Sequence, residues 1–106
     1  MNKHPYFDEV KFALELFDKE GFKPIGFDDG DGILNTTNDI NTIIEGVLSV
    51  DDSEVKLQYE DKTLTLYFVL GNEPGVAISD YSYITSRKDI MEKVESICNM
   101  VYDNFN

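Results

Sequence analysis

Two runs of alternating apolar and polar residues in the middle of the chain constrain the fold more than any other feature. One run spans residues 55–59 and the other spans residues 64–70. In both runs every second residue is apolar, which is the pattern of a strand with one buried face. A tight turn at residues 60–62 separates them. The sequence therefore predicts a β-hairpin, with Leu66 and Phe68 on its buried face.

Apolar residues at helical spacing predict three helices. These cover residues 5–20, residues 38–49 and the segment from Ser86 almost to the C-terminus. Gly46 and several β-branched residues disfavour the middle helix, because they are poor helix formers. Cys98, the only cysteine, lies on the apolar stripe of the last helix. This position favours a buried structural thiol over a reactive nucleophile.

The remaining strand signals complete an α+β fold. Strands are predicted over residues 22–27 and 76–81, and Pro24 favours an edge position for the first because proline lacks the N–H group of the ladder. Together with the hairpin they form a mainly antiparallel sheet of about four strands. The order α-β-α-β-β-β-α predicts a two-layer sandwich, with the three helices on one face of the sheet. Residues 1–106 are expected to form a single acidic domain.

Charge separates this chain from an average one. It has 21 acidic and nine basic residues, which gives a formal net charge of −12. Such a chain is expected to attract a basic protein and to bind neither nucleic acid directly nor a membrane surface. The chain has no apolar run of about 18 residues, and its first residues, Met1 to Pro5, lead into charged sequence. With a single cysteine, these features predict a cytoplasmic protein.

An acidic loop resembles the start of a calcium site but does not complete it. If Asp29 takes the first position of an EF-hand loop, Asp31 takes the third. Leu34 then stands where the loop needs glycine, and Ile40 where it needs glutamate. Weak cation binding by these carboxylates is one reading of the loop. A solvated turn that needs glycine at positive φ is the other.

Catalytic and cofactor motifs are also incomplete. Gly30 and Gly32 form a lone G-x-G, because Asn35 occupies the position of the third glycine in a dinucleotide-binding loop. His4 is the only histidine and lies near the N-terminus, so any histidine-based triad or zinc site would have to depend on it alone, and an incidental terminal histidine is the favoured reading. We therefore predict no catalytic residue, no metal ligand and no cofactor.

Candidate partner-binding residues lie in two acidic turns and on the sheet face away from the helices. Strand alternation places Tyr67 and Tyr81, on the third and fourth predicted strands, on that face, and tyrosine is enriched in protein interfaces. The same alternation points Asp80 towards the edge of the core. The candidate residues are Asp28, Asp29, Asp31, Asp51, Asp52, Tyr67 and Tyr81.

Three functions are compatible with this sequence. The first is a non-enzymatic binding or inhibitor protein whose carboxylates engage a basic partner, in the manner of the nucleic-acid mimics carried by phages and mobile elements. That analogy depends on charge and size. The second is a small enzyme or ligand-binding domain with a site lined by Asp, Glu and Tyr. The third is a structural or assembly subunit that forms a homodimer through its open sheet face. A concave pocket with convergent carboxylates would favour the second, and a convex acidic ridge the first.

Overall fold

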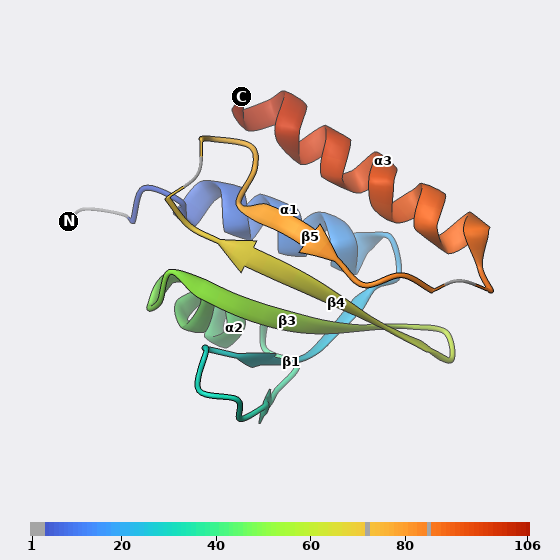
Figure 1. Cartoon of the computed structure of the whole chain (residues 1–106), viewed down its shortest axis with the longest axis horizontal. Coiled ribbons are helices and arrows are strands. Elements are labelled where there is room, and N and C mark those ends of the chain that lie inside the picture. The colour runs from blue at the N-terminus through green and yellow to red at the C-terminus, as the bar shows by residue number, and fades with distance from the viewer. Residues whose placement is uncertain (1–3, 72, 85) are drawn as a thin grey trace.

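Three helices pack against an antiparallel sheet in the computed structural model, which describes residues 4–71, 73–84 and 86–106 (Figure 1). In those residues the sheet has five strands in the order β2-β1-β3-β4-β5. The predicted two-layer α+β fold is confirmed, with one strand more than expected. The elements are α1 (Phe7–Lys19), β1 (Lys23–Asp28), β2 (Asn35–Thr36), α2 (Ile40–Leu48), β3 (Asp52–Tyr59), β4 (Lys62–Val69), β5 (Ile78–Tyr81) and α3 (Lys88–Phe105).

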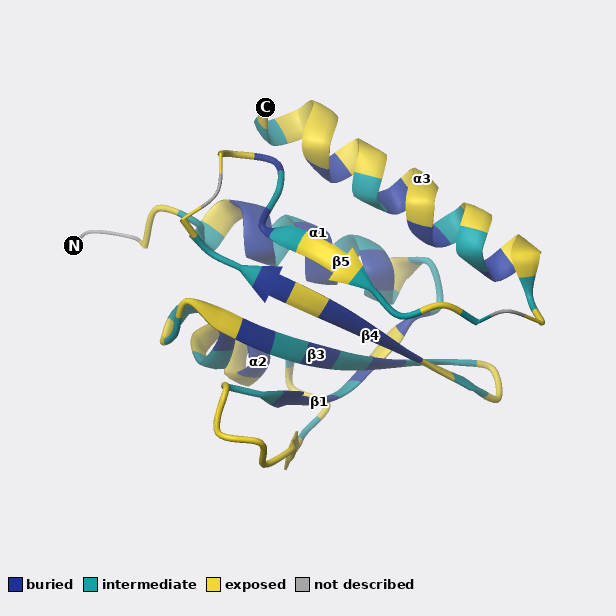
Figure 2. Ribbon diagram, viewed as in Figure 1, coloured by how far each residue is buried: buried dark blue, intermediate teal, exposed yellow. Residues whose placement is uncertain are grey.

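The central hairpin forms as the alternation predicts. β3 and β4 pair without a break from Asp52 opposite Val69 to Tyr59 opposite Lys62. Leu66 is fully buried, and buried positions alternate with more exposed ones along β3; in β4 the alternation is interrupted at Thr65, which is also buried (Figure 2). The sheet therefore has one face in the core and one face turned away from the helices. We call the second face the open face.

The helices cover the other face of the sheet and close the core. In Figure 1, α1 and α2 lie behind the sheet, and α3 runs beyond β5. The Phe12 and Phe105 rings meet at a centroid distance of 5.5 Å and join α1 to α3. Phe22, which follows α1, stacks on Tyr59 of β3 at 4.4 Å. These contacts leave the open face without a covering layer.

The first strand differs from the edge position that Pro24 predicts. β1 lies between β2 and β3, but β2 pairs only with Gly26 and Phe27. Among the described residues, no strand pairs with Pro24 on the side away from β3, and the register with β3 shifts between Pro24 and Gly26. The missing N–H of Pro24 therefore falls where the ladder is already interrupted.

Gly46 lies inside α2 because another side chain needs the space of its missing Cβ. A Cβ atom built on Gly46 would lie 2.2 Å from Cε2 of Phe27. Phe27 packs from β1 against α2 with 8 % of its surface exposed. Packing therefore requires glycine at position 46, because the Phe27 ring lies directly against the helix backbone.

Candidate functional site

A row of four side chains crosses the open face, one from each of four neighbouring strands. Asp28 of β1 pairs with Glu54 of β3, Glu54 with Tyr67 of β4, and Tyr67 with Asp80 of β5. We call these residues the acidic row. The Cβ atoms of directly opposed residues in an antiparallel sheet lie about 4.5–5.5 Å apart. The row therefore places two carboxylates, Asp28 and Glu54, side by side.

One lysine compensates part of the row. Lys56 Nζ lies 3.6 Å from Glu54 Oε1, and it donates a hydrogen bond to Thr65 Oγ1 at 2.8 Å. No described lysine or arginine lies within 4.0 Å of Asp28 or Asp80. A single partly exposed pair at Glu54 contributes little, roughly 0–1 kcal/mol. The row therefore keeps a net negative charge.

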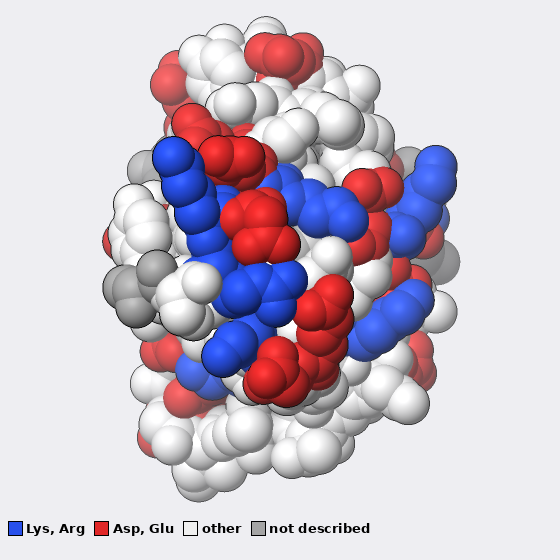
Figure 3. Space-filling model, turned by 90° about the vertical axis from the view of Figure 1, so that its right-hand side faces the viewer, with Lys and Arg blue, Asp and Glu red and all other residues white. Residues whose placement is uncertain are grey.

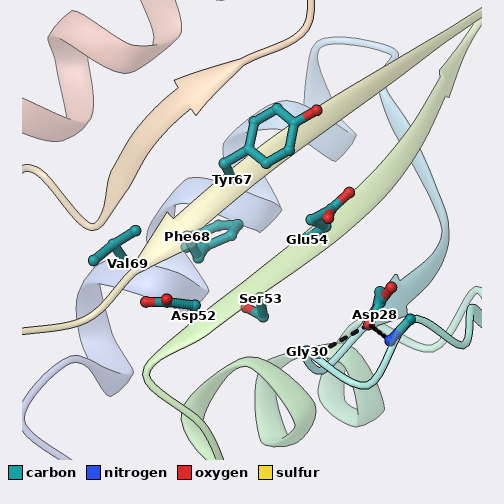
Figure 4. A pocket seen from close by; sticks show the side chains of 9 residues that line it. Asp28, Gly30, Asp52, Ser53, Glu54, Tyr67, Phe68 and Val69 are labelled. Carbon is teal, nitrogen blue, oxygen red and sulfur yellow. Dashed lines mark hydrogen bonds between the residues drawn. The ribbon is translucent and has the colours of Figure 1, made fainter.

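A pocket of about 370 Å³ opens beside the row (Figure 4). Asp28 and Glu54 of the row line it, and Asp52 at the start of β3 adds a third carboxylate. Tyr67 and Val69 of β4 supply an aromatic ring and an aliphatic group. We call this cavity the acidic pocket. The predicted Asp28, Asp52 and Tyr67 thus come together, although they are far apart in the chain.

Local hydrogen bonds fix the loop that borders the pocket. Asp28 Oδ1 accepts from the backbone N–H of Gly30 at 2.9 Å and of Gly32 at 3.2 Å. Both glycines have positive φ, 103° and 83°, which explains their place in this loop. Asp31 Oδ1 accepts from Ile33 N–H at 3.0 Å in the same way. The carboxylate of Asp28 is therefore held in position before any partner arrives.

The three loop carboxylates form an incomplete cation site. One oxygen each from Asp28, Asp29 and Asp31 lies within 4.8 Å of the others. Ca²⁺ takes about six to eight oxygen ligands, so most of its ligands here would be water. Asp28 Oδ1 already accepts two N–H groups. This geometry fits the solvated turn better than a dedicated metal centre.

The second acidic turn adjoins this loop. Asp51 and Asp52 are both exposed. A Cβ atom built on Gly30 would lie 3.4 Å from the backbone oxygen of Asp52, so the loop and the turn are in contact. The predicted acidic residues of the two turns therefore form one surface, which we call the acidic end: Asp28, Asp29, Asp31, Asp51 and Asp52.

The predicted placement of Tyr81 and Asp80 is wrong because β5 contains a register shift. Phe68 pairs with Ile78, but the next residue of β4, Tyr67, pairs with Asp80. The extra residue, Ser79, reverses the alternation, so Asp80 joins the open face and Tyr81 packs against the core. Burial raises the pKa of Tyr81 above its usual value. Tyr67 and Tyr81 therefore do not share a face.

Glu54 is a further site residue that the sequence did not single out. Its alternation with Val55 indicates a polar face, but only the strand register places it opposite Asp28. The register of β1 against β3 shifts between Pro24 and Gly26, and the residue pattern of β3 alone does not show that shift. The charged face of β3 was the only available signal.

Charges of opposite sign gather at the other end of the sheet, around the β3–β4 turn. Arg87 pairs with Glu60 at 3.1 Å and with Asp89 at 2.9 Å, and Lys23 pairs with Asp18 at 3.1 Å. Figure 3 shows this end of the molecule, where lysine and arginine alternate with acidic side chains. By contrast, no described lysine or arginine lies within ion-pair distance of the acidic end. Among the described residues, Asp61, Glu92, Glu95 and Asp103 also lack such a partner, so the acidic end differs in that five uncompensated aspartates adjoin there.

Comparisons with protein-family models, with curated proteins and with solved structures gave no match to this chain. Among the described residues, none of the three helices combines the length and the apolar character that a bilayer-spanning helix needs. The geometry and charge of the acidic end and the open face are the observations from which a function can be argued.

Proposed function

We propose that the protein is a non-enzymatic binding protein that engages a basic protein partner through its acidic end and the adjoining open face. The carrying observation is the clustering of five uncompensated aspartates at one end of the molecule. Around the β3–β4 turn Arg87 and Lys23 pair with neighbouring acids, although Asp61 has no such partner, while the five aspartates of the acidic end have no described cation within 4.0 Å. A field concentrated at one end orients an approaching basic surface towards it.

The energy of such binding is spread over many weak pairs. An exposed ion pair is worth roughly 0–1 kcal/mol, so no single aspartate is decisive. Their combined field acts mainly on the association rate. It is screened over a Debye length of about 8 Å at physiological salt. Binding through the acidic end should therefore be fast at low salt and slower as salt rises.

A nucleic-acid-binding protein is the class of partner that this charge pattern favours. Its basic surface is built to meet phosphates, and carboxylates held on a rigid sheet can occupy comparable positions. Inhibition by mimicry, as in small acidic proteins of phages and mobile elements, is the corresponding role. The net charge of −12 and the five adjoining aspartates of the acidic end support such a partner.

The acidic pocket is a concave site with convergent carboxylates, the feature that favours the ligand-binding reading, and it supports a second candidate function, the binding of a small cationic ligand. Its volume of about 370 Å³ lies in the range of ligand pockets, which is about 300–1,000 Å³.

Dimerisation through the open face is disfavoured by the same residues. A two-fold dimer would bring one acidic row against another, and like charges across an interface cost binding energy.

The test compares two variants that remove the same number of charges from different ends. The acidic-end variant replaces four aspartates by asparagine: Asp28, Asp31, Asp51 and Asp52. The matched control neutralises four exposed acids elsewhere, as Asn or Gln: Asp61, Glu92, Glu95 and Asp103. Proteins that wild type retains from a lysate at low salt are identified and purified, and their association rates are measured against all three forms.

The proposal predicts that the acidic-end variant associates about tenfold more slowly, while the control changes much less. The rate for wild type should fall as NaCl rises from 50 to 300 mM. Equal slowing by both variants would show that net charge acts without a dedicated surface. An association rate that changes neither with salt nor in either variant would overturn the proposal.

A further inference from the structure

The shape of the acidic pocket restricts the group that can fill it. The cavity of about 370 Å³ is much larger than a bare ammonium group needs. Its polar lining comes from Asp28, Asp52 and Glu54, and its apolar lining from Tyr67 and Val69. An occupant with a cationic head and an apolar stem would meet both kinds of surface.

The acidic row carries a repulsion that a cation would relieve. Asp28 and Glu54 are directly opposed, and like charges in such a pair destabilise a sheet. Lys56 reaches Glu54 at 3.6 Å but is also held by Thr65 at 2.8 Å. A second cation between Asp28 and Glu54 would therefore gain from both carboxylates without displacing Lys56.

A guanidinium group fits this arrangement better than an ammonium group. It is planar, has five N–H donors, and can bond two carboxylates at once. It also stacks on an aromatic face, and Tyr67 is 37 % exposed on the open face beside Glu54. Figure 4 shows Tyr67 and Glu54 projecting on the same side of the sheet.

We propose that the acidic pocket binds an arginine side chain presented by the basic partner. The guanidinium lies between the carboxylates of Asp28 and Glu54 and over the ring of Tyr67, and the methylene stem runs along Val69. This inference rests on the proposed function and names the group of the partner that the site recognises.

The test uses small probes in place of the partner. Blocked arginine, lysine and citrulline, each as the N-acetyl N-methylamide, are titrated into ¹⁵N-labelled protein at low salt. Arginine should give saturable amide shifts centred on residues 28–32, 52–54 and 67–69. Lysine should bind about threefold or more weakly, because it cannot form the fork or stack as a plane. Citrulline, which has the same shape without the charge, should not bind.

Two tyrosine variants test the geometry. Tyr67→Leu keeps apolar bulk but removes the aromatic face, and it should raise the arginine dissociation constant about threefold or more. The control, Tyr83→Leu, alters a tyrosine that is 73 % exposed and does not line the pocket, and it should leave the constant unchanged.

Equal binding of lysine and arginine, or unsaturable shifts spread over all acidic surfaces, would overturn this inference. In either case the salt-dependent association with a basic partner could still hold, because it depends on the acidic end as a whole. Conversely, the acidic-end variant could bind the partner as fast as wild type even though wild type binds arginine saturably. That result would confirm that the pocket binds arginine and would refute the proposed function.

Discussion

The buried carboxylate of Glu9 accepts a hydrogen bond of 2.9 Å from the backbone N–H of Ala77, 68 residues further along the chain. Its other oxygen accepts from Gly75 N–H, also at 2.9 Å. Glu9 is 4 % exposed, although its neighbour in the first turn of α1, Asp8, is exposed. One side chain thus anchors the β4–β5 loop to the first helix.

Removing this carboxylate should destabilise the protein strongly. Glu9→Ala leaves two buried N–H groups without an acceptor, and each costs about 1–3 kcal/mol. We expect a loss of about 2–5 kcal/mol in the free energy of unfolding, measured by urea denaturation. Glu15→Ala, on the exposed side of α1, is the control and should change stability by less than about 0.5 kcal/mol. A loss below 1 kcal/mol for Glu9→Ala would contradict this role.

Gly46 provides a case in which helix propensity and packing predict opposite signs. By propensity alone, Gly46→Ala should stabilise α2 by about 1 kcal/mol. The new Cβ would lie 2.2 Å from the Phe27 ring, however, so overpacking should reverse the sign and destabilise by about 1–3 kcal/mol. Thermal or urea unfolding measures the difference.

A double-mutant cycle identifies the cause of that loss. Phe27→Leu alone should destabilise, because it shortens a buried side chain. In the Phe27→Leu background, Gly46→Ala should cost less than in wild type, because the ring that it meets is gone. Strictly additive effects of the two substitutions would exclude the steric explanation.

The thiol of Cys98 should react slowly in the folded protein. Burial raises its pKa to about 11, and the nearby carboxylate of Glu95 adds to the shift. Since the thiolate is the reactive form, iodoacetamide at pH 8 should modify the native protein at least about tenfold more slowly than the urea-unfolded protein. The native rate should rise steeply as pH approaches 11. Equal rates at pH 8 would mean that the thiol is freely accessible.

The raised pKa of Cys98 also fixes the sign of a stability change. In the unfolded chain the thiol ionises near its usual pKa of 9.0, while in the fold it stays protonated up to about 11. Between these values the unfolded state binds fewer protons, so stability falls as pH rises. Cys98→Ala should reduce this part of the decline.

Local patterns predicted most of the fold because they report burial of one face at a time. The hairpin at residues 55–70 and the three helices follow directly from apolar spacing. β2 was not predicted, because its two exposed residues are too few to show a periodic pattern. The register shift at Ser79 was not predicted either, because a bulge inserts one residue without changing composition. This shift reversed the predicted faces of Asp80 and Tyr81.

The candidate site was predicted in part, for the same physical reason. Asp28, Asp52 and Tyr67 stood out by charge cluster or strand face. Their union with Glu54 depends on the register of three strands, which tertiary pairing determines. Glu9 gave no signal, because its partners are backbone N–H groups that any sequence provides.

The acidic end should lower the stability of the free protein while it promotes binding. Its five aspartates repel one another without a described cation nearby, so screening by salt should raise the free energy of unfolding. The acidic-end variant, with Asp28, Asp31, Asp51 and Asp52 changed to asparagine, removes most of that repulsion. It should be more stable than wild type at 10 mM NaCl, by up to about 1 kcal/mol, and should gain less when NaCl rises to 500 mM.

The control variant, with Asp61, Glu92, Glu95 and Asp103 neutralised, has the same net charge and separates local from global repulsion. If the repulsion is local, urea unfolding at 10 and 500 mM NaCl should show the larger low-salt stabilisation in the acidic-end variant. Stability and association should then change in opposite directions in that one variant, because the charges that attract a basic partner also repel one another in its absence. Identical salt responses of the two variants would contradict a localised repulsion. The net charge of −12 would then be the explanation for both the stability and the association rate.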